Sequence, residues 1–428
     1  MSRTTHPSPF VAIACGGTGG HLFPGVAVAE ALLRRGCAVM LLVSTKEVDQ
    51  QAVRDLADVE VAALPAVGLT RGRFLAFLRG FRESYAVASG LFRGRMPHAV
   101  LAMGGFTSAP PVLAARRLGA FAFLHESNTI PGRANRWLSW MVGRAFIGFP
   151  SAASRLHCRN VTVTGMPVRP QIGRRDPGAC RTALGLDPSR PVVLVMGGSQ
   201  GASGVNEAVE RSLPEFARRQ PSWQWFHLAG PLDAERMRQA YAGLKLRAVV
   251  HPFFTEMELA LGAATAAVSR AGASSLAELA AARLPAVLVP YPAATDNHQF
   301  HNAAAYERSG SARLLEQKDA RVENLAPLLR ELVEVSAVRA AMQAALAAWH
   351  APEAAELIAE AMLTEAWRGG RLDDSNVPSS SSDPGSQRDR LALTPSAASA
   401  ASAGRLLPLC FAPEMAGVDH QPRSRRFA

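Results

Sequence analysis

The sequence predicts an α/β protein made of two Rossmann-like, doubly wound domains in tandem, and two observations carry this prediction. Short apolar runs alternate with helical or loop segments, which is the pattern of a parallel sheet with crossover helices. A strand, a glycine-rich loop and a helix also follow one another twice, in 11–36 and in 190–209. Ligands bind beyond the carboxyl ends of such strands, so two facing halves are expected to form a site in the cleft between them.

The first strand, loop and helix are expected between Phe10 and Gly36. Phe10–Cys15 is an apolar run typical of a buried strand, and four of the five residues at 16–20 are glycines. Pro24 is expected in the first turn of a helix that Gly36 ends. Glycine backbone approaches ligands closely and helix N-termini favour anions, so this loop is predicted to bind a diphosphate. Its spacing matches neither GxGxxG nor a P-loop, which disfavours nicotinamide and ATP.

Further strands and the domain limits follow from the remaining apolar runs. The expected strands are 37–44, 99–105, 120–126 and 144–150 in the first half, and 192–196, 223–230, 247–253, 266–272 and 285–291 in the second. Prolines cluster at 164–170, where the linker is placed. We expect an N-terminal domain at 1–168 that binds acceptor and membrane, and a donor-binding domain at 169–368 whose last helix can return to the first. The Ser-, Pro-, Ala- and Gly-rich tail at 369–428 is expected to be disordered.

Composition fits a globular protein of a reducing compartment. The five cysteines show no CxxC spacing, so neither a disulfide framework nor a zinc site is expected. An apolar signal segment and a run of 18 apolar residues are both lacking, so the chain is expected to be neither exported nor membrane-spanning. A D-x-D motif is also lacking, so no metal and no other cofactor is expected.

The charge distribution suggests an anionic surface as partner. Residues 1–170 hold 19 Arg and Lys against 8 Asp and Glu, whereas 171–368 hold 20 against 21. No nucleic-acid-binding motif accompanies the basic part, so no nucleic acid is expected. The stretch 69–85 combines apolar residues with arginines, which predicts contact with anionic lipid. The four residues predicted at that membrane face are Phe77, Arg79, Phe81 and Arg82. The alternative is an amphipathic helix packed on the sheet.

Seven motifs in order, from about residue 10 to about residue 365, resemble the MurG family of bacterial peptidoglycan glycosyltransferases, which have the GT-B fold. The motifs are GGTGGH (16–21), AMGGFTSAPP (102–111), HESN (125–128), GMPVR (165–169), GGSQGA (197–202), SRAGASSLAELAAARLPAVLVPYP (269–292) and DNHQFHNA (296–303). The resemblance implies inverting transfer of N-acetylglucosamine from UDP-N-acetylglucosamine to the undecaprenyl-linked acceptor lipid I, which forms lipid II. It also implies a peripheral enzyme on the cytoplasmic side of the inner membrane.

The resemblance further implies roles for individual residues. Glu278 contacts the ribose, Ser199 the phosphates, Gln299 the sugar hydroxyls, and the backbone at Phe254 the uracil. Asn128 reaches the donor from the first domain and Arg169 from the linker. The remaining predicted substrate-binding residues lie in the first glycine loop and the 269–292 motif, namely Thr18, Gly19, Gly20, Ala273, Ser274, Ser275, Leu276 and Ala277.

The general base is expected to be a histidine, because imidazole titrates near neutrality. His21, at the start of the first helix, is the first candidate and His125 the second. The sequence departs from the common motifs of the family at Phe106, where tyrosine is frequent, and at Met166, where asparagine is frequent. Because Phe106 lacks a hydroxyl, it cannot hydrogen-bond the acceptor through its side chain.

Two other functions compete with the transfer to lipid I. One is a different enzyme acting on UDP-sugars, such as a UDP-N-acetylglucosamine 2-epimerase or another lipid-linked transferase, which would share the donor half of the site. The other is a nucleotide-binding protein without catalysis. The presence of His21, Glu278 and Gln299 disfavours the second alternative.

Overall fold

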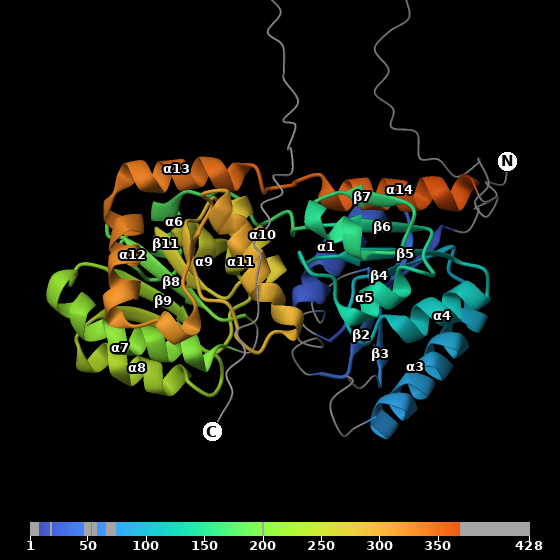
Figure 1. The fold of residues 1–428 in the computed structure, drawn as a ribbon, viewed down its shortest axis with the longest axis horizontal. Helices are drawn as coiled ribbons and strands as arrows, with labels where there is room; N and C mark the ends of the chain where they lie inside the picture. The colour runs from blue at the N-terminus through green and yellow to red at the C-terminus, as the bar shows by residue number, and fades with distance from the viewer. Residues whose placement is uncertain are drawn as a thin grey trace, which may run out of the picture. The chain divides into compact units, whose positions relative to one another are not determined.

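The computed structural model describes residues 8–17, 19–46, 53, 58–65, 74–198 and 201–368, with side chains to residue 366. Thr18 and Ser199, predicted above to bind substrate, lie outside the described residues, as does the whole 369–428 tail. The described chain forms two parallel sheets flanked by helices (Figure 1). The doubly wound α/β class expected from the sequence is therefore confirmed.

The first sheet has the strand order β3-β2-β1-β4-β5-β6-β7 in the described residues. Every neighbouring pair is parallel, and Val11 of the central strand is opposite Val39 on one side and Ala99 on the other. The order reverses between β1 and β4, so the switch point of the sheet lies between these two strands. The strands are β1 (Phe10–Ala14), β2 (Ala38–Ser44), β3 (Glu60–Leu64), β4 (Ala99–Ala102), β5 (Phe121–Glu126), β6 (Arg144–Ile147) and β7 (Val161–Val163).

The second sheet repeats this plan in the order β10-β9-β8-β11-β12-β13, again all parallel, with its switch point between β8 and β11. Continuous apolar runs form its centre because both faces are covered by helices, and every residue of β8 is buried. The strands are β8 (Val192–Met196), β9 (Gln224–Leu228), β10 (Arg247–His251), β11 (Ala266–Ser269), β12 (Ala286–Leu288) and β13 (Arg313–Leu314).

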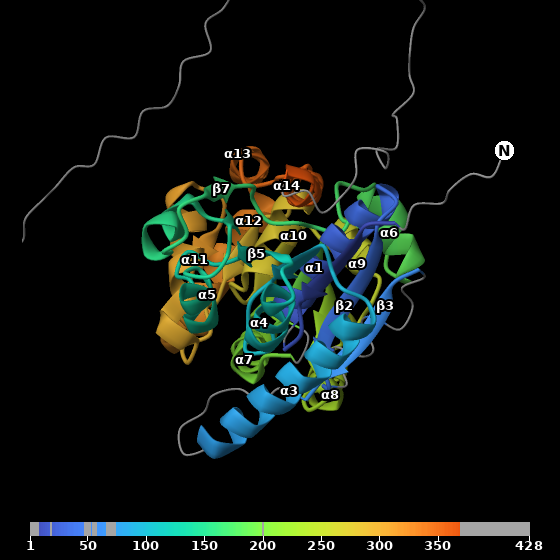
Figure 2. The ribbon, with the colours of Figure 1, turned by 90° about the vertical axis from the view of Figure 1, so that its right-hand side faces the viewer.

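Helices connect the strands of both sheets (Figure 1). Those of the first half are α1 (Gly19–Arg34), α3 (Phe74–Gly94), α4 (Ala109–Arg117) and α5 (Arg133–Leu138). Those that follow are α6 (Pro177–Ala183), α7 (Ser203–Arg219), α8 (Ala234–Gly243), α9 (Met257–Ala263), α10 (Ala273–Ala282), α11 (His298–Arg308), α12 (Val322–Glu334), α13 (Ser336–Ala347) and α14 (Ala354–Arg368). Figure 2 shows the N-terminal end of α3 projecting from the first sheet.

The last helix, α14, packs on the first half of the chain rather than the second. Ile358 and Met362 share a buried apolar cluster with Val11 and Ile13 of β1, and α14 contacts α1. Before α14, Trp349 stacks on Tyr306 of α11, with ring centroids 4.4 Å apart. The chain thus joins its two halves a second time here, while the boundary at 168/169 stays a prediction.

The structure differs from the sequence expectations at three short strands and one helix start. β3, β7 and β13 were not predicted, because runs of two to five residues with weak apolar character give little periodic signal. The helix α1 begins at Gly19, so Pro24 lies inside it and not in its first turn. The expectation failed there because glycines, normally helix-breaking, start this helix.

Candidate active site

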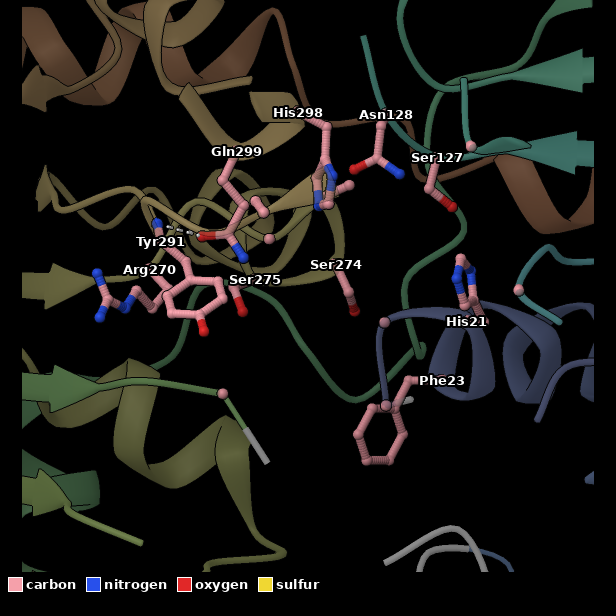
Figure 3. Close-up of a pocket in the computed structure, with 18 of the residues that line it drawn as sticks. His21, Phe23, Ser127, Asn128, Arg270, Ser274, Ser275, Tyr291, His298 and Gln299 are labelled. Carbon is pink, nitrogen blue, oxygen red and sulfur yellow. Dashed lines mark hydrogen bonds between the residues drawn. The ribbon is translucent and has the colours of Figure 1, made fainter. Parts of the chain in front are cut away.

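A cavity of about 1570 Å³ lies where the loops at the switch points of both sheets meet. Loops after β1, β4 and β5 line it from the first half, and loops after β8 and β11 line it from the second. Figure 3 shows His21 and Phe23 of α1 apart from Ser274, Ser275 and Gln299, with the pocket between them. Residues from both halves of the chain therefore line the same cavity.

The start of α1 brings Gly19, Gly20 and His21 to the cavity wall. The loop after β4 packs closely on the imidazole of His21. A Cβ atom built on Gly104 would lie 2.9 Å from His21 Cε1, and Gly104 has a φ of +108°, which favours glycine. The bare backbone therefore fixes the His21 ring against the first sheet while the ring borders the cavity.

His125, the second candidate base, lies behind the cavity at the end of β5. Its side chain is completely buried, and its Nε2 atom lies 3.4 Å from the carbonyl oxygen of Gly165. Burial lowers the pKa of His125 to about 4, with the nearby His21 acting in the same direction. A neutral, buried imidazole suits a structural role better than proton exchange with a substrate.

Asn128 is held in the cavity wall by the buried carboxyl group of Glu126. That carboxyl accepts from the backbone N–H of Asn128 (2.8 Å), from Asn128 Nδ2 (3.2 Å), from the backbone N–H of Gly132 (3.1 Å) and from Asn135 Nδ2 (2.7 Å). Burial raises the pKa of Glu126, whereas these donors lower it. Glu126 was not singled out from the sequence, although it stands inside the HESN motif.

The start of α10 faces the cavity with its helix N-terminus uncapped. The N-cap residue is Gly272, and no side chain caps the helix. Ala273, Ser274 and Ser275 line the cavity, and helix N-termini of this kind attract anions through their N–H groups and dipole.

Two predicted neighbours of that helix start take no part in the cavity wall. Leu276 is completely buried, and its backbone N–H already donates to the carbonyl of Gly272. Ala277 is buried as well, at 4% exposure. Their predicted contacts with substrate have no support in the geometry, because the helix has turned both residues into the core.

Glu278 and Arg169 form a buried charged pair at the base of the cavity. Arg169 Nη2 lies 3.8 Å from Glu278 Oε1, and both side chains are nearly nine-tenths buried. The guanidinium also lies over the ring of Phe23, 4.5 Å from its centroid. Burial raises the pKa of Glu278 to about 7, and Arg169 acts in the opposite direction. Arg169 Nε and Nη2 are buried and form no hydrogen bond within the described residues, and Arg169 as a whole lines the cavity.

The second glycine loop lies beside this pair. Gly197, Gly198 and Gly201 line the cavity, and a Cβ on Gly201 would lie 2.5 Å from the carbonyl oxygen of Ala229. Phe254 also borders the cavity, with its ring 5.1 Å from that of Phe226. Its ring therefore takes part in the packing of the second half.

The turn before α11 and the first residues of that helix bring Asp296 and Gln299 to the cavity wall. Asp296 and Asn297 both have φ of +52°, a left-handed conformation that Asp and Asn tolerate better than most residues. Asp296, which lines the cavity, accepts a hydrogen bond of 2.6 Å from Arg136 of α5. Gln299 Oε1 accepts from the backbone N–H of Tyr291 (3.0 Å), and Figure 3 shows its amide nitrogen turned toward the pocket.

Several cavity residues were missed by the sequence analysis. Lys46 donates to the carbonyl of Gly17 at 2.9 Å, and His298 Nδ1 lies 2.8 Å from the carbonyl of Thr295. Buried Arg270 donates to Gln317 Oε1 at 2.6 Å. Arg270 and His298 lie in the 269–292 and 296–303 motifs, so their position next to predicted site residues could have identified them. Lys46 follows β2 with no motif to mark it.

The predicted membrane segment is the amphipathic helix α3 in its described part. Phe77 and Phe81 are half-buried, 6.1 Å apart between centroids, and both line the cavity. The most exposed apolar side chains on α3 are Leu75 at 80% and Phe74 at 58%. Arg79 pairs with Glu83 at 2.7 Å, whereas Arg82 lines a small surface pocket beside α4.

The described residues contain neither a metal-binding cluster nor a membrane-spanning helix. No group of three or more His, Cys, Asp or Glu side chains there is arranged to hold a metal ion. Within the same residues, none of the helices combines the length and apolar character needed to cross a bilayer.

Comparison with known proteins identifies the family. The glycosyltransferase family 28 N-terminal domain matches residues 11–147, and the glycosyltransferase family 28 C-terminal domain matches residues 192–358. A curated relative from Xanthomonas oryzae pv. oryzae is 39% identical over 87% of this chain and 83% of its own length. A relative from Desulforudis audaxviator is 36% identical over 84% of this chain and 100% of its own. Both are named UDP-N-acetylglucosamine–N-acetylmuramyl-(pentapeptide) pyrophosphoryl-undecaprenol N-acetylglucosamine transferase.

Solved structures agree at the level of the fold. The crystal structure of Acinetobacter baumannii MurG is 25% identical, with a TM-score of 0.64 over 84% of this chain and 100% of that one. A Listeria monocytogenes protein described as a UDP-N-acetylglucosamine 2-epimerase has a TM-score of 0.62 at 13% identity, over 86% of this chain and 99% of that one, and so shares the fold alone. The fold does not separate transferase from epimerase, but the sequence relationships do, and they make this chain an N-acetylglucosaminyltransferase of glycosyltransferase family 28, in the MurG family.

Proposed function

We propose that this chain transfers N-acetylglucosamine from UDP-N-acetylglucosamine to the muramoyl sugar of lipid I, with inversion, and so forms lipid II. One observation carries the proposal beyond family membership. The imidazole of His21 and the uncapped start of α10 border the same cavity from opposite halves of the chain. A sugar nucleotide transferase needs a base for the acceptor and an anion site for the leaving group, and these two features have that chemistry.

The UDP part of the donor is proposed to occupy the second half. Its diphosphate lies at the start of α10, next to Ser274 and Ser275, and near the glycine loop after β8, with Ser199 as a further predicted contact. Arg169, two of whose nitrogens form no hydrogen bond within the described residues, supplies positive charge. The carboxylate of Glu278 accepts from the ribose hydroxyls, and the backbone at Phe254 reads the uracil.

The sugar is proposed to lie between Gln299 and Asn128, nearer the first glycine loop with Thr18, Gly19 and Gly20. The Nε2 group of Gln299 can donate to sugar hydroxyls because its Oε1 is already bonded to Tyr291. This position brings the anomeric carbon toward His21.

The reaction then follows from these positions. His21 accepts the proton of the acceptor hydroxyl as that oxygen attacks the anomeric carbon. The bond from the anomeric carbon to the phosphate oxygen breaks, and the electron pair leaves with UDP. The N–H groups of α10 and the guanidinium of Arg169 stabilise the charge that develops on the diphosphate.

The acceptor is proposed to arrive from a membrane surface along α3. Phe77, Leu78 and Phe81 line the cavity, and Phe74, one turn earlier on the same helix face, is exposed beside Leu75, so an apolar face continues from the surface into the site. Arg79 and Arg82 flank that face, and each arginine near an anionic surface contributes about 1 kcal/mol. This supports peripheral attachment to the cytoplasmic leaflet.

The transfer is tested with labelled UDP-N-acetylglucosamine and a lipid I analogue. We expect label in the lipid product and one UDP released for each transfer. Conversion of the donor to another UDP-sugar without acceptor would instead favour the epimerase, and tight UDP binding with neither product would favour a binding protein.

The membrane face is tested by sedimentation with vesicles. We expect salt-sensitive binding to anionic vesicles and none to zwitterionic ones, because the attraction is electrostatic. Leu75→Ser combined with Arg82→Glu should weaken that binding without touching the cavity wall. Arg308→Glu, at the exposed end of α11 in the second half, is the matched control for a change of charge on another helix. Wild-type sedimentation by the α3 variant would exclude α3 as the membrane face.

A further inference from the structure

One buried amide, that of Asn302, ties together three segments around the cavity. Asn302 lies on α11, four residues after His298 and so on the same helix face, and it is completely buried. Its Oδ1 accepts from the backbone N–H (3.0 Å) and the hydroxyl (2.9 Å) of Thr129. Its Nδ2 donates to Asn128 Oδ1 (3.0 Å) and to the carbonyl of Ala271 (3.2 Å). Every hydrogen-bonding position of this amide is therefore used.

These bonds fix the orientation of two amides at once. The Glu126 carboxyl accepts from Asn128 Nδ2, so Asn128 Oδ1 must turn toward Asn302. At the other end the backbone N–H of Thr129 can only donate, so Asn302 Oδ1 must face it. The hydrogen bonds between these two fixed groups therefore allow a single assignment of donors and acceptors. It leaves one N–H of Asn128 unused by the bonds described, on a residue that lines the cavity.

The same amide also spans the two halves of the chain. Asn128 and Thr129 follow β5 of the first sheet, whereas Ala271 follows β11 of the second and Asn302 belongs to α11. The orientation of Asn128 therefore depends on contact between the halves.

We propose that Asn302 is a positioning residue for sugar recognition, which holds the Asn128 amide so that its remaining N–H points to the donor sugar. This inference rests on the proposed function, in which Asn128 contacts that sugar. Asn302 itself touches no substrate and acts through Asn128. Because UDP lacks the sugar, its affinity for the protein should not depend on Asn302.

The test is a double-mutant cycle read by calorimetric binding of UDP-N-acetylglucosamine and of UDP. Asn302→Ala should weaken UDP-N-acetylglucosamine binding about fivefold or more, the worth of one hydrogen bond, and leave UDP binding within about twofold. In an Asn128→Ala background the same substitution should cause almost no further loss, because the two residues act in series. Asn324→Ala, the same replacement on the exposed side of α12, is the matched control and should change neither affinity.

Three results would overturn the inference, and each has a different meaning. Additive losses in the double variant would show that Asn302 does not act through Asn128. Equal losses for UDP and UDP-N-acetylglucosamine would show general disruption of the site. Full UDP-N-acetylglucosamine affinity in Asn128→Ala would show that the proposed sugar contact itself is misassigned.

A second variant keeps the test decisive if Asn302→Ala does not fold. Asn302→Asp retains the shape and both bonds from Thr129, but its carboxylate cannot donate to Asn128. We expect the same selective loss of UDP-N-acetylglucosamine affinity, and unchanged affinity for both ligands would contradict the proposal.

Discussion

The starts of α1 and α10 both border the cavity, yet they present different chemistry to it. The first turn of α1 carries two glycines and then His21, whose ring is pressed against Gly104. The first turn of α10 carries small residues with no side-chain cap, followed by the buried carboxyl of Glu278. In the proposed function the same backbone feature, a helix start beside a parallel sheet, serves two tasks. The side chains at each start are proposed to suit one to proton transfer and the other to donor binding.

The largest expected effect comes from removing the imidazole at the start of α1. His21→Ala should lower kcat by about 10²- to 10⁴-fold, the usual contribution of a general base, with little change in the donor KM. Steady-state kinetics with a lipid I analogue measure both constants.

His125→Ala is the companion variant that challenges this assignment. Burial lowers the pKa of His125 to about 4 and keeps this residue out of the cavity wall. We therefore expect His125→Ala to lower the stability of the protein more than its kcat. If His21→Ala turned over normally while His125→Ala, still folded, did not, the base would be His125.

A smaller effect is expected at the start of α10. Glu278→Ala should raise the donor KM about tenfold or more, because a hydrogen bond to a charged acceptor is worth about 1.5–3 kcal/mol. The kcat at saturating donor should fall less than in His21→Ala. A folded variant with an unchanged donor KM would remove Glu278 from the site.

The raised pKa of Glu278 also predicts a pH dependence of stability. The folded protein holds this proton more tightly than the unfolded chain, so the linked stability is present below the usual pKa of 4.5 and is lost as pH rises through about 7. Glu278→Gln cannot lose a proton and should reduce the fall in stability between about pH 5 and about pH 8. Urea unfolding at both pH values measures this, and an identical fall in the variant would contradict it.

The smallest effect is expected at the ion pair between Arg136 and Asp296. Arg136→Ala removes the bond to Asp296, a partly exposed pair of the kind worth about 0.2–1 kcal/mol. Donor KM should rise less than about fivefold, and the rise should diminish at high salt. A rise in donor KM as large as that of Glu278→Ala would show that the ion pair does more than stabilise the turn before α11.

The fold was predictable where the chain repeats a strong local pattern. β8 was predicted at its observed limits because Val192–Met196 is a continuous apolar run followed by a glycine loop. The edge strand β13 has two residues, too few for any periodicity. The start of α1 was missed because Gly19 and Gly20 have low helix propensity, and tertiary packing overrode it.

The site was predictable only where motifs mark it. The first glycine loop and His21 were predicted from their place after a buried strand, whereas the roles of 273–278 were predicted through the motif that resembles the MurG family. The contact of Asn302 with Thr129 joins residues 173 positions apart, and no local pattern reports such a distance. Burial of His125 and Leu276 likewise depends on what packs over them, which only the folded chain decides.

The division of labour between the two helix starts is tested most directly by UDP binding to two variants measured side by side. We predict that His21→Ala binds UDP as tightly as the wild type, whereas Glu278→Ala binds it about tenfold more weakly or worse. Calorimetry gives both dissociation constants under the same conditions. Equal losses in the two variants, or a loss confined to His21→Ala, would contradict the assignment of chemistry to α1 and donor binding to α10.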